Sequence, residues 1–320
     1  IRRPPRSTQG VSSAASDVYK RQDMMSGDHG TSSSAPAAID SLNKFNDIFL
    51  ILIGDEDQIN SLLSEKIKKL EGIKYKIIHT KEYISMNDDI VSAIRSKKKS
   101  SMRLAVNAVK NKEADACVSA GNTGALMALS KIILKTIPGI DRPAICGSLP
   151  TKTSQFHMLD LGANVECSAK HLYEFAIMGS ALVQSLNLKT KPVIGLLNIG
   201  SEDFKGNETI KTAGQLIQKS NLNYAGFVEG DDMFNGKFDV IVTDGFAGNI
   251  ALKSIEGVAK VISHFIKQEF TKNIFTKLSA LISLPVMKSF KNKVDPRKYL
   301  SLIHISEPTR QEAISYAVFC

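Results

Sequence analysis

From residue 47 onward the chain alternates between short apolar runs and longer segments with helical periodicity. The apolar runs have strand length, are rich in Val, Ile and Leu, and cover residues 47–54, 75–79, 114–120, 143–150, 156–162, 192–200, 223–230 and 238–245. Apolar residues recur at helical spacing in most of the segments between them, at 56–70, 88–112, 123–136, 168–186 and 206–219. Because strands that alternate with helices form βαβ units, the pattern predicts an α/β fold with a mostly parallel sheet and helices on both faces.

A different pattern follows at residues 247–290. Apolar residues recur there at helical spacing over a much longer stretch, with lysines between them and Pro285 near the end. An apolar face flanked by lysines is typical of a core helix, a helix that packs in a dimer, or a helix that lies on a membrane surface. The pattern favours core or dimer packing and leaves membrane contact open.

Neither end of the chain shows the periodicity of a strand or of a helix. Residues 1–22 are basic and lack the apolar central region of a signal peptide. Residues 301–320 are equally unlike the segment that precedes them. Both ends resemble translated sequencing-adapter read-through, so we expect residues 1–22 to be artefactual or disordered, residues 301–320 to be an artefactual tail, and residues 23–300 to form the domain.

Composition and charge argue against some classes of protein and indicate what kind of partner the chain suits. The chain is 43% hydrophobic, which argues against a disordered protein, and its longest apolar runs have strand length, well short of the roughly 20 residues that cross a bilayer. The formal net charge is +9; the two ends carry +4 and −1, which leaves +6 for the interior. A modestly basic domain suits an acidic partner or a phosphorylated ligand, and equally an ordinary solvated surface.

Cysteines and histidines provide no metal-type spacing. The four cysteines and six histidines are scattered, with no redox pair and no zinc pattern. We therefore expect a reduced, cytoplasmic protein without a metal or other cofactor.

The stretch "SAGNTG" places Gly121, Asn122, Thr123 and Gly124 between a predicted strand and a predicted helix. A helix N-terminus presents free N–H groups and a partial positive charge, so it binds anions, and glycines allow a ligand to approach the backbone. The alternative is plain helix capping by Asn122 or Thr123, which are both good cap residues.

Other polar, glycine-bearing turns follow the remaining strands and carry further candidate residues. They supply Asp28 and His29 in "SGDHG", Asp160 and Asn164 in "LDLGANVE", Lys205 in "GSEDFKGNE", and Asp244 and Asn249 in "TDGFAGN". Because ligands of open α/β sheets bind beyond the carboxyl ends of the strands, these turns are expected to gather along one edge. Each turn taken alone is equally compatible with an ordinary turn that ends a strand and has no functional role.

The basic stretch "RSKKKSSMR" at residues 95–103 contains no acidic residue. It is interpreted either as the solvated end of a helix or as a docking site for an acidic partner.

Taken together and in order, these motifs resemble the phosphate acyltransferase family of bacterial phospholipid synthesis, the PlsX family. The matching blocks span roughly residues 23–300 and include "DMMSGDHG" (23–30), "KKKSSMRLAVNAVK" (97–110), "ADACVSAGNTGALMA" (114–128), "LDLGANVECSAKHLYEFAIMGS" (159–180), "GLLNIGSEDFKGNE" (195–208) and "DVIVTDGFAGNIALKSIEG" (239–257). Several long blocks in one order form a far more specific signal than any single glycine motif.

The resemblance implies an α/β/α three-layer sandwich like that of the isocitrate and isopropylmalate dehydrogenases, usually as a homodimer. It implies transfer of a fatty acyl group from acyl carrier protein to inorganic phosphate, which gives an acyl phosphate for a membrane acyltransferase that acylates glycerol 3-phosphate. It also implies a cytoplasmic protein that associates peripherally with the membrane, without a metal and with no nucleic-acid partner.

The same resemblance and the chemistry of the residues together suggest a role for each candidate. Residues 121–124 would form the anion cradle, Lys205 would hold phosphate, and Asn249 would donate to a carbonyl or phosphate oxygen. Asp28 and His29 would complete the pocket, with His29 as a proton carrier to the leaving thiolate. Asp160, Asn164 and Asp244 are expected to shape it.

The chain also departs from the family pattern. A polar stretch replaces the expected apolar strand before Asp23, Ser26 stands in place of a glycine, and the expected glycine-rich block and closing helix do not follow residue 300. We therefore expect the domain to be incomplete at both ends. Two other interpretations remain, a related phosphotransacetylase-like or dehydrogenase-like enzyme and a non-catalytic scaffold that binds acyl carrier protein or a membrane. The dehydrogenase would need a metal-binding carboxylate cluster, which is not seen.

Overall fold

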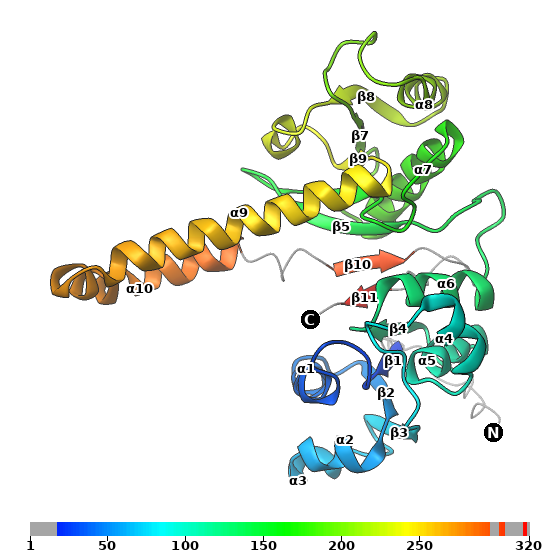
Figure 1. Ribbon diagram of the computed structural model, residues 1–320, viewed down its shortest axis with the longest axis vertical. Coiled ribbons are helices and arrows are strands. Elements are labelled where there is room, and N and C mark those ends of the chain that lie inside the picture. The colour runs from blue at the N-terminus through cyan, green and yellow to red at the C-terminus, as the bar shows by residue number, and fades with distance from the viewer. Residues whose placement is uncertain (1–17, 295–300, 305–315, 319–320) are drawn as a thin grey trace, which may run out of the picture.

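The computed structural model describes residues 18–294, 301–304 and 316–318, and within them the chain forms two β-sheets with flanking helices (Figure 1). The first sheet has the strand order β3-β2-β1-β4, and the second has the order β11-β10-β5-β6-β9-β7-β8. β10 and β11 lie between the two halves of the molecule, and β11 contacts β4.

The first half of the chain builds the four-stranded sheet, whose neighbouring strands are all parallel. Its strands are β1 (Val18–Asp23), β2 (Ile48–Gly54), β3 (Tyr75–His79) and β4 (Ala116–Ser119). Its helices are α1 (Thr31–Lys44), α2 (Glu56–Leu62), α3 (Glu65–Lys68), α4 (Ile90–Ser96), α5 (Ser101–Lys110) and α6 (Thr123–Ile133).

The second half builds the larger sheet. Its strands are β5 (Ile145–Pro150), β6 (Gln155–Leu159), β7 (Val193–Leu197), β8 (Asn223–Val228), β9 (Val240–Val242), β10 (Ser301–His304) and β11 (Tyr316–Val318). Its helices are α7 (Ala169–Ser185), α8 (Glu208–Gln218), the 3-10 helix η1 (Asp232–Asn235), α9 (Gly245–Thr271) and α10 (Ile274–Val294). β6, β9, β7 and β8 are parallel, whereas β5, β10 and β11 join by antiparallel pairing.

Both sheets are covered on two faces because successive side chains of a strand point to opposite sides. In β2, Leu50 and Leu52 pack toward α1, whereas Ile51 and Ile53 pack toward α5 and α6. In the second sheet, Leu159 packs with α7 and α8, and Met158 packs on the opposite face with the start of α9. The predicted three-layer α/β architecture with a mostly parallel sheet is confirmed.

The predicted strands are present within a few residues of their expected bounds, and the segments at 56–70 and 88–112 each contain two helices instead of one. The sequence pattern missed α1, whose segment "TSSSAPAAIDSLNK" buries only small residues and one leucine. It also missed the antiparallel hairpin of β5 and β6, because an apolar strand carries no signal for its direction.

The predicted domain start at residue 23 falls inside β1 and needs correction. Val18–Asp23 pairs in parallel with β2 on one side and with β4 on the other, so residues 18–22 belong to the middle of the first sheet. Strands in such positions are normally almost continuously apolar, whereas β1 reads "VYKRQD". At the other end, Ser301–His304 and Tyr316–Val318 lie in the second sheet, inside the segment expected to be a tail. The remaining residues of 1–22 and 301–320 lie outside the described part of the chain.

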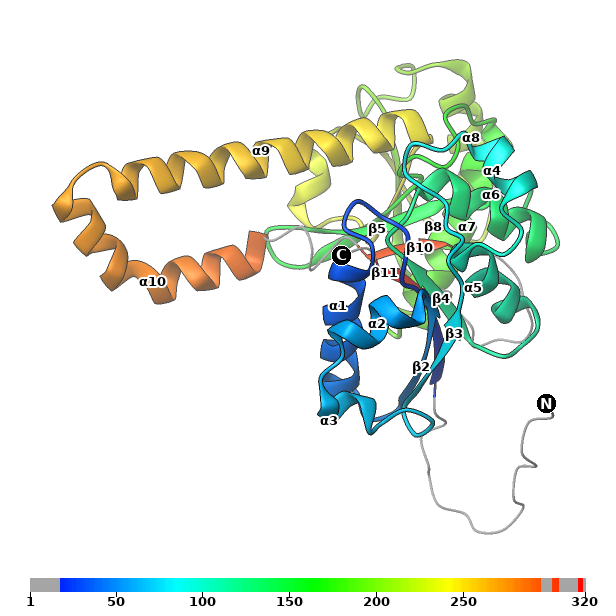
Figure 2. The same cartoon turned by 60° about the horizontal axis from the view of Figure 1, so that its bottom comes forward.

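Helices α9 and α10 form a long hairpin that projects from the second sheet, as both views show (Figures 1 and 2). Only the first turns of α9 are buried, through Gly245, Gly248 and Leu252. Beyond them the hairpin exposes a series of large apolar side chains: Val258, Val261, Ile262, Phe265, Ile274, Phe275, Leu278, Leu281, Ile282, Leu284, Val286 and Phe290. The core-helix interpretation of 247–290 is therefore wrong for most of its length.

The polar strand β1 contains a buried charge. The Arg21 side chain is only 3% exposed and forms an ion pair with Glu113, which is half exposed. Burial lowers the pKa of the guanidinium, which still stays charged in a protein, and its Nε has no hydrogen-bond partner. Such a charge costs desolvation energy that an apolar side chain in the same strand would not.

We expect Arg21→Leu to raise the free energy of unfolding by about 1–2 kcal/mol, because it removes the buried charge and leaves only the half-exposed Glu113, which water can solvate. Glu113→Ala should lower it, by less than the roughly 3–5 kcal/mol of a fully buried pair, because Glu113 is partly hydrated. Urea unfolding of the three proteins measures both effects. Destabilisation by Arg21→Leu would mean that the ion pair outweighs its desolvation.

Candidate functional site

The candidate residues lie on loops that leave the carboxyl ends of parallel strands. In the first sheet, β1 has β2 on one side and β4 on the other, and the connections run to opposite faces. Such a switch point between neighbouring strands is where open α/β sheets bind ligands. The loops after β1 and β4, residues 24–30 and 120–122, meet there. In the second sheet, the loops after β6, β9 and β7 leave the same edge, because these three strands are parallel neighbours.

Asp23, the last residue of β1, organises the first pair of loops. It is 1% exposed, and its carboxylate accepts hydrogen bonds from the N–H groups of Met25 (3.2 Å) and Ser26 (3.3 Å) and from the Ser119 hydroxyl (2.7 Å). The Ser119 oxygen in turn accepts from the Gly121 N–H at 3.1 Å. One buried carboxylate therefore fixes both loops.

The two loops touch so closely that only glycine fits at the contacts. A Cβ on Gly121 would lie 2.4 Å from the Ser26 Cβ, and a Cβ on Gly27, which has a φ of +99°, would lie 2.6 Å from the Ala120 carbonyl oxygen. These contacts bring together "SGDHG" and "SAGNTG", which begin 93 positions apart in the sequence, at residues 26 and 119. The buried Ser26 hydroxyl has no hydrogen-bond partner.

Asn122 caps α6, as the structural alternative predicted. Its side-chain oxygen accepts from the Ala125 N–H at 3.1 Å, and its amide donates to the Met86 carbonyl at 3.2 Å. Both ends of the side chain are therefore engaged within the protein. Asp28 and His29 are exposed on the neighbouring loop, where their side chains are open to a ligand.

Asp160 performs the corresponding role in the second sheet. It is fully buried and accepts five N–H hydrogen bonds of 2.7–3.3 Å: from the backbones of Ile145, Gly162, Ala163 and Asn164 and from the Asn164 side chain. Burial raises the pKa of this carboxyl, and the hydrogen bonds act in the opposite direction. With no exposed surface, Asp160 holds the loop in shape and offers no atom to a ligand.

The start of α9 packs directly on that loop. The Gly245 N–H donates to the Asn164 carbonyl at 2.8 Å, and a Cβ on Gly248 would lie 1.9 Å from the Asp160 carbonyl oxygen. Asn249 is exposed beside Gly162, whose Cβ position lies 3.5 Å from the Asn249 Cβ. The contact places the Asn249 amide at the rim of the β6 loop.

Lys205 lies on the loop after β7, which is the strand next to β9. Its ammonium pairs with Glu202 at 2.9 Å, and this hydrogen bond raises the pKa of the lysine. The Lys205 carbonyl accepts from the buried Asn198 side chain at 3.1 Å, which ties the loop to the end of β7. The side chain is 39% exposed, so the ammonium can reach a ligand.

The structure thus sorts the predicted residues into two groups. Residues 28, 29 and 121–124 lie at the end of the first sheet, and residues 160, 164, 205, 244 and 249 lie at the end of the second. No hydrogen bond or ion pair between described residues joins the groups, or joins Lys205 to Asn249. Their convergence on one ligand therefore stays a prediction.

A polar hollow of about 680 Å³ opens beside the β6 loop, lined by Arg142, residues 163–168 and His171. Of the predicted residues it includes Asn164 alone. Burial raises the pKa of the Cys167 thiol to about 11, so this cysteine stays protonated at neutral pH and does not provide a thiolate nucleophile. Within the described residues, no cluster of three or more His, Cys, Asp or Glu side chains is arranged to hold a metal.

Sequence reasoning missed the organising residues Asp23 and Ser119. The signal available was weak, namely an aspartate at the end of a strand and directly before a glycine-bearing turn. The same signal marks Asp160, which the sequence did single out.

Comparison with known proteins assigns the family. A family model described as a fatty acid synthesis protein matches residues 22–303. The phosphate acyltransferase of Methylococcus capsulatus is 52% identical over 277 residues, which are 87% of this chain and 81% of the relative. The chain belongs to the phosphate acyltransferase family. The phosphate acyltransferase of Nitrosococcus oceani is 50% identical over the same shares, and the resemblance seen in the motifs is confirmed.

Solved structures support the fold of this phosphate acyltransferase family member. A phosphotransacetylase from Streptococcus pyogenes matches with a TM-score of 0.56 at 18% identity, over 76% of this chain and 82% of the other. The EutD phosphotransacetylase from Staphylococcus aureus matches with a TM-score of 0.55 at 18% identity, over 76% and 83%. At this identity the likeness concerns the architecture alone.

Asp244 provides a test of capping against ligand binding. Its side chain accepts from the Ala247 N–H at 2.7 Å and caps α9. We expect Asp244→Ala to lower the free energy of unfolding by about 1 kcal/mol and Asp244→Ser, which keeps a cap, to lower it much less. Thermal unfolding measures this difference. If Asp244→Ser were stable yet lost turnover, the carboxylate would act on the substrate instead.

Proposed function

We propose that this chain transfers a fatty acyl group from acyl carrier protein to inorganic phosphate and so forms an acyl phosphate for phospholipid synthesis. The observation that carries the proposal is the match to the phosphate acyltransferase family across residues 22–303, which includes every candidate loop. Use of the carrier protein, as opposed to another thioester, rests on the resemblance described above.

The loops fit the chemistry of an anion and a carbonyl. An oxygen of phosphate attacks the thioester carbon, a C–O bond forms, the C–S bond breaks, and the thiolate leaves and takes up a proton. Donors that are already in position contribute most to such a reaction, because they stabilise charge without rearrangement. Lys205 and the backbone N–H groups of residues 122–124 would hold phosphate, with Gly121 leaving room for its approach, and Asn249 would donate to the developing oxyanion. His29, exposed on its loop, would protonate the thiolate.

An acyl chain also needs apolar surface, and the loops that carry Lys205 and Asn249 provide it. Ile199 and Phe204 are 79% and 74% exposed on the β7 loop, and Phe246 and Ile250 are 62% and 50% exposed at the start of α9. Large exposed apolar side chains on the same segments as polar donors suit a site for an amphipathic substrate.

Phosphate-dependent release of free thiol from acyl carrier protein tests the function. We expect Lys205→Ala and Asn249→Ala each to lower turnover by about 10²-fold, the usual effect of losing one preorganised donor. Lys211→Ala is the matched control, because Lys211 forms an ion pair of the same i,i+3 spacing with Glu208 on α8. A wild-type chain that binds the carrier protein but releases no thiol would indicate the non-catalytic scaffold instead.

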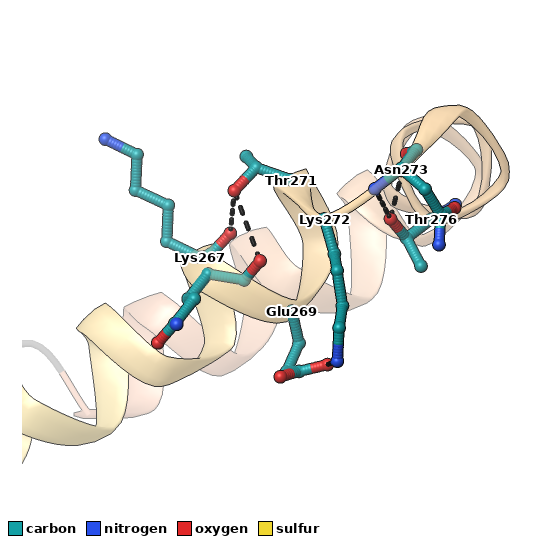
Figure 3. A network of polar contacts seen from close by, with 7 residues as sticks. Lys267, Glu269, Thr271, Lys272, Asn273 and Thr276 are labelled. Carbon is teal, nitrogen blue, oxygen red and sulfur yellow. Dashed lines mark hydrogen bonds and ion pairs between the residues drawn. The ribbon is translucent and has the colours of Figure 1, made fainter.

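The α9–α10 hairpin is the element we propose for contact with a second copy of the chain and with a membrane surface. Its turn is well defined: Asn273 and Thr276 exchange two hydrogen bonds of 3.0 Å between side chain and backbone, which start α10 (Figure 3). Lys272 and Glu269 form an ion pair beside them. Each helix within the described residues falls short of the length or the apolar content that a bilayer-spanning segment needs. An exposed apolar hairpin with lysines between fits surface contact and a cytoplasmic, peripherally bound protein that delivers acyl phosphate to a membrane acyltransferase.

We expect Phe275→Ser combined with Ile282→Ser to weaken self-association or binding to anionic vesicles at least tenfold. The two side chains are 79% and 78% exposed, so the fold should survive, and tenfold is about 1.4 kcal/mol, less than burial of one such side chain contributes. Sedimentation and vesicle flotation measure the two contacts. Ile73→Ser, at a 71% exposed position before β3, is the control. Unchanged behaviour in both assays would contradict the proposal.

A further inference from the structure

An exposed apolar strip borders the loop of residues 121–124 in the first sheet. Tyr83, Met86 and Val91 are 44%, 41% and 57% exposed, and they lie on the segment that connects β3 to α4 and on the first turn of α4. We call these three residues together with Arg95, Lys98 and Lys99 the α4 surface. Figures 1 and 2 show α4 next to α6, whose N-terminus carries the loop.

Direct contacts join the α4 surface to the loop. The Asn122 amide donates to the Met86 carbonyl at 3.2 Å. A Cβ on Gly124 would lie 2.6 Å from the Ile90 Cδ1, so the first turn of α6 lies against the first turn of α4. A partner seated on the α4 surface is therefore held beside residues 121–124.

The basic charge of the α4 surface comes from residues 95–103. Residues 95–103 contain five cations and no carboxylate. Lys97 is paired with Asp88, and Arg103 donates to the Ile94 carbonyl at 2.6 Å. Arg95, Lys98 and Lys99 remain exposed. Three acids lie beside the surface: Glu82 accepts from the Lys99 backbone N–H, Asp88 pairs with Lys97, and Asp89 caps α4 by accepting from the Ser92 N–H at 2.9 Å. Among the described residues, none of the three is joined by a hydrogen bond or ion pair to the side chain of Arg95, Lys98 or Lys99.

We propose that the α4 surface docks the acidic carrier protein that delivers the acyl thioester. Tyr83, Met86 and Val91 would provide the apolar centre of the contact, and Arg95, Lys98 and Lys99 would pair with carboxylates at its rim. The proposal rests on the proposed function, because it requires a carrier whose thioester must reach the phosphate held at residues 121–124. Charge complementarity and continuity with that loop favour an acidic protein over a lipid surface.

Charge reversal tests the docking surface. We expect Lys98→Glu combined with Lys99→Glu to raise the KM for acyl carrier protein at least tenfold at low salt, with kcat and the KM for phosphate changed less than threefold. The effect should shrink as salt rises to about 1 M, where charges are screened beyond about 3 Å. Lys66→Glu combined with Lys69→Glu is the matched control. These two exposed lysines lie on and directly after α3, next to the edge strand β3, and give the same change in net charge.

A second variant tests the apolar centre. Met86→Ser should raise the same KM at least threefold without changing the Tm by more than about 2 °C, because its side chain is partly exposed already. Equilibrium titration with the carrier protein should follow the same order as the KM values.

The outcomes separate this inference from the function. If the wild-type chain releases no thiol, the proposed function fails. If it does, and Lys98→Glu with Lys99→Glu leaves the KM unchanged or matches the control pair, the docking surface alone is wrong. Loss of binding to anionic vesicles with an unchanged KM would assign the α4 surface to lipid and would also overturn the inference.

Discussion

The structure depends on buried aspartates that hold glycine-bearing loops at the ends of parallel strands. Asp160 accepts five N–H donors, and Asp23 accepts two N–H groups and a hydroxyl. A carboxylate removed from water is costly unless donors surround it, so each aspartate forces the backbone to turn around it. His29 is exposed on the turn that Asp23 holds, and Asn249 is exposed on α9, beside the turn that Asp160 holds. In both sheets, therefore, a buried aspartate holds a loop in place at the end of a parallel strand.

The difference between buried supporting residues and solvent-facing residues explains why the candidate residues differ in exposure. Asp160 and Asn164 are interior supports, whereas Lys205, Asn249, Asp28 and His29 are open or partly open to solvent. A phosphate acyltransferase needs both kinds, because donors stabilise a transition state only when their positions are fixed beforehand. Glycine at 121, 245 and 248 is required by the close packing itself, since a side chain there would collide with the neighbouring loop.

The remaining surface features are exposed apolar areas that lie outside the cores of the two sheets. The hairpin of α9 and α10 exposes apolar side chains along most of its length, and the α4 surface adds a smaller strip with cations beside it. The hairpin is the surface proposed above for another copy or a membrane, and the α4 surface is the one proposed for an acidic protein. The polar strand β1, with the buried Arg21, shows that the sheet also tolerates a costly central segment.

The sequence by itself determined the α/β class, the strands β2 to β9, and the loops that carry Lys205 and Asn249. Local periodicity and glycine-bearing turns carry that information, because they reflect burial of each element alone. Only the tertiary structure decided that residues 18–22 form part of a central strand. It also decided that the Asn122 side chain bonds to the Ala125 N–H and the Met86 carbonyl, and that most of 247–290 lies outside the core. Those outcomes depend on which distant segments become neighbours, and no local pattern in the chain encodes strand partners, direction or the face that a long helix leaves uncovered.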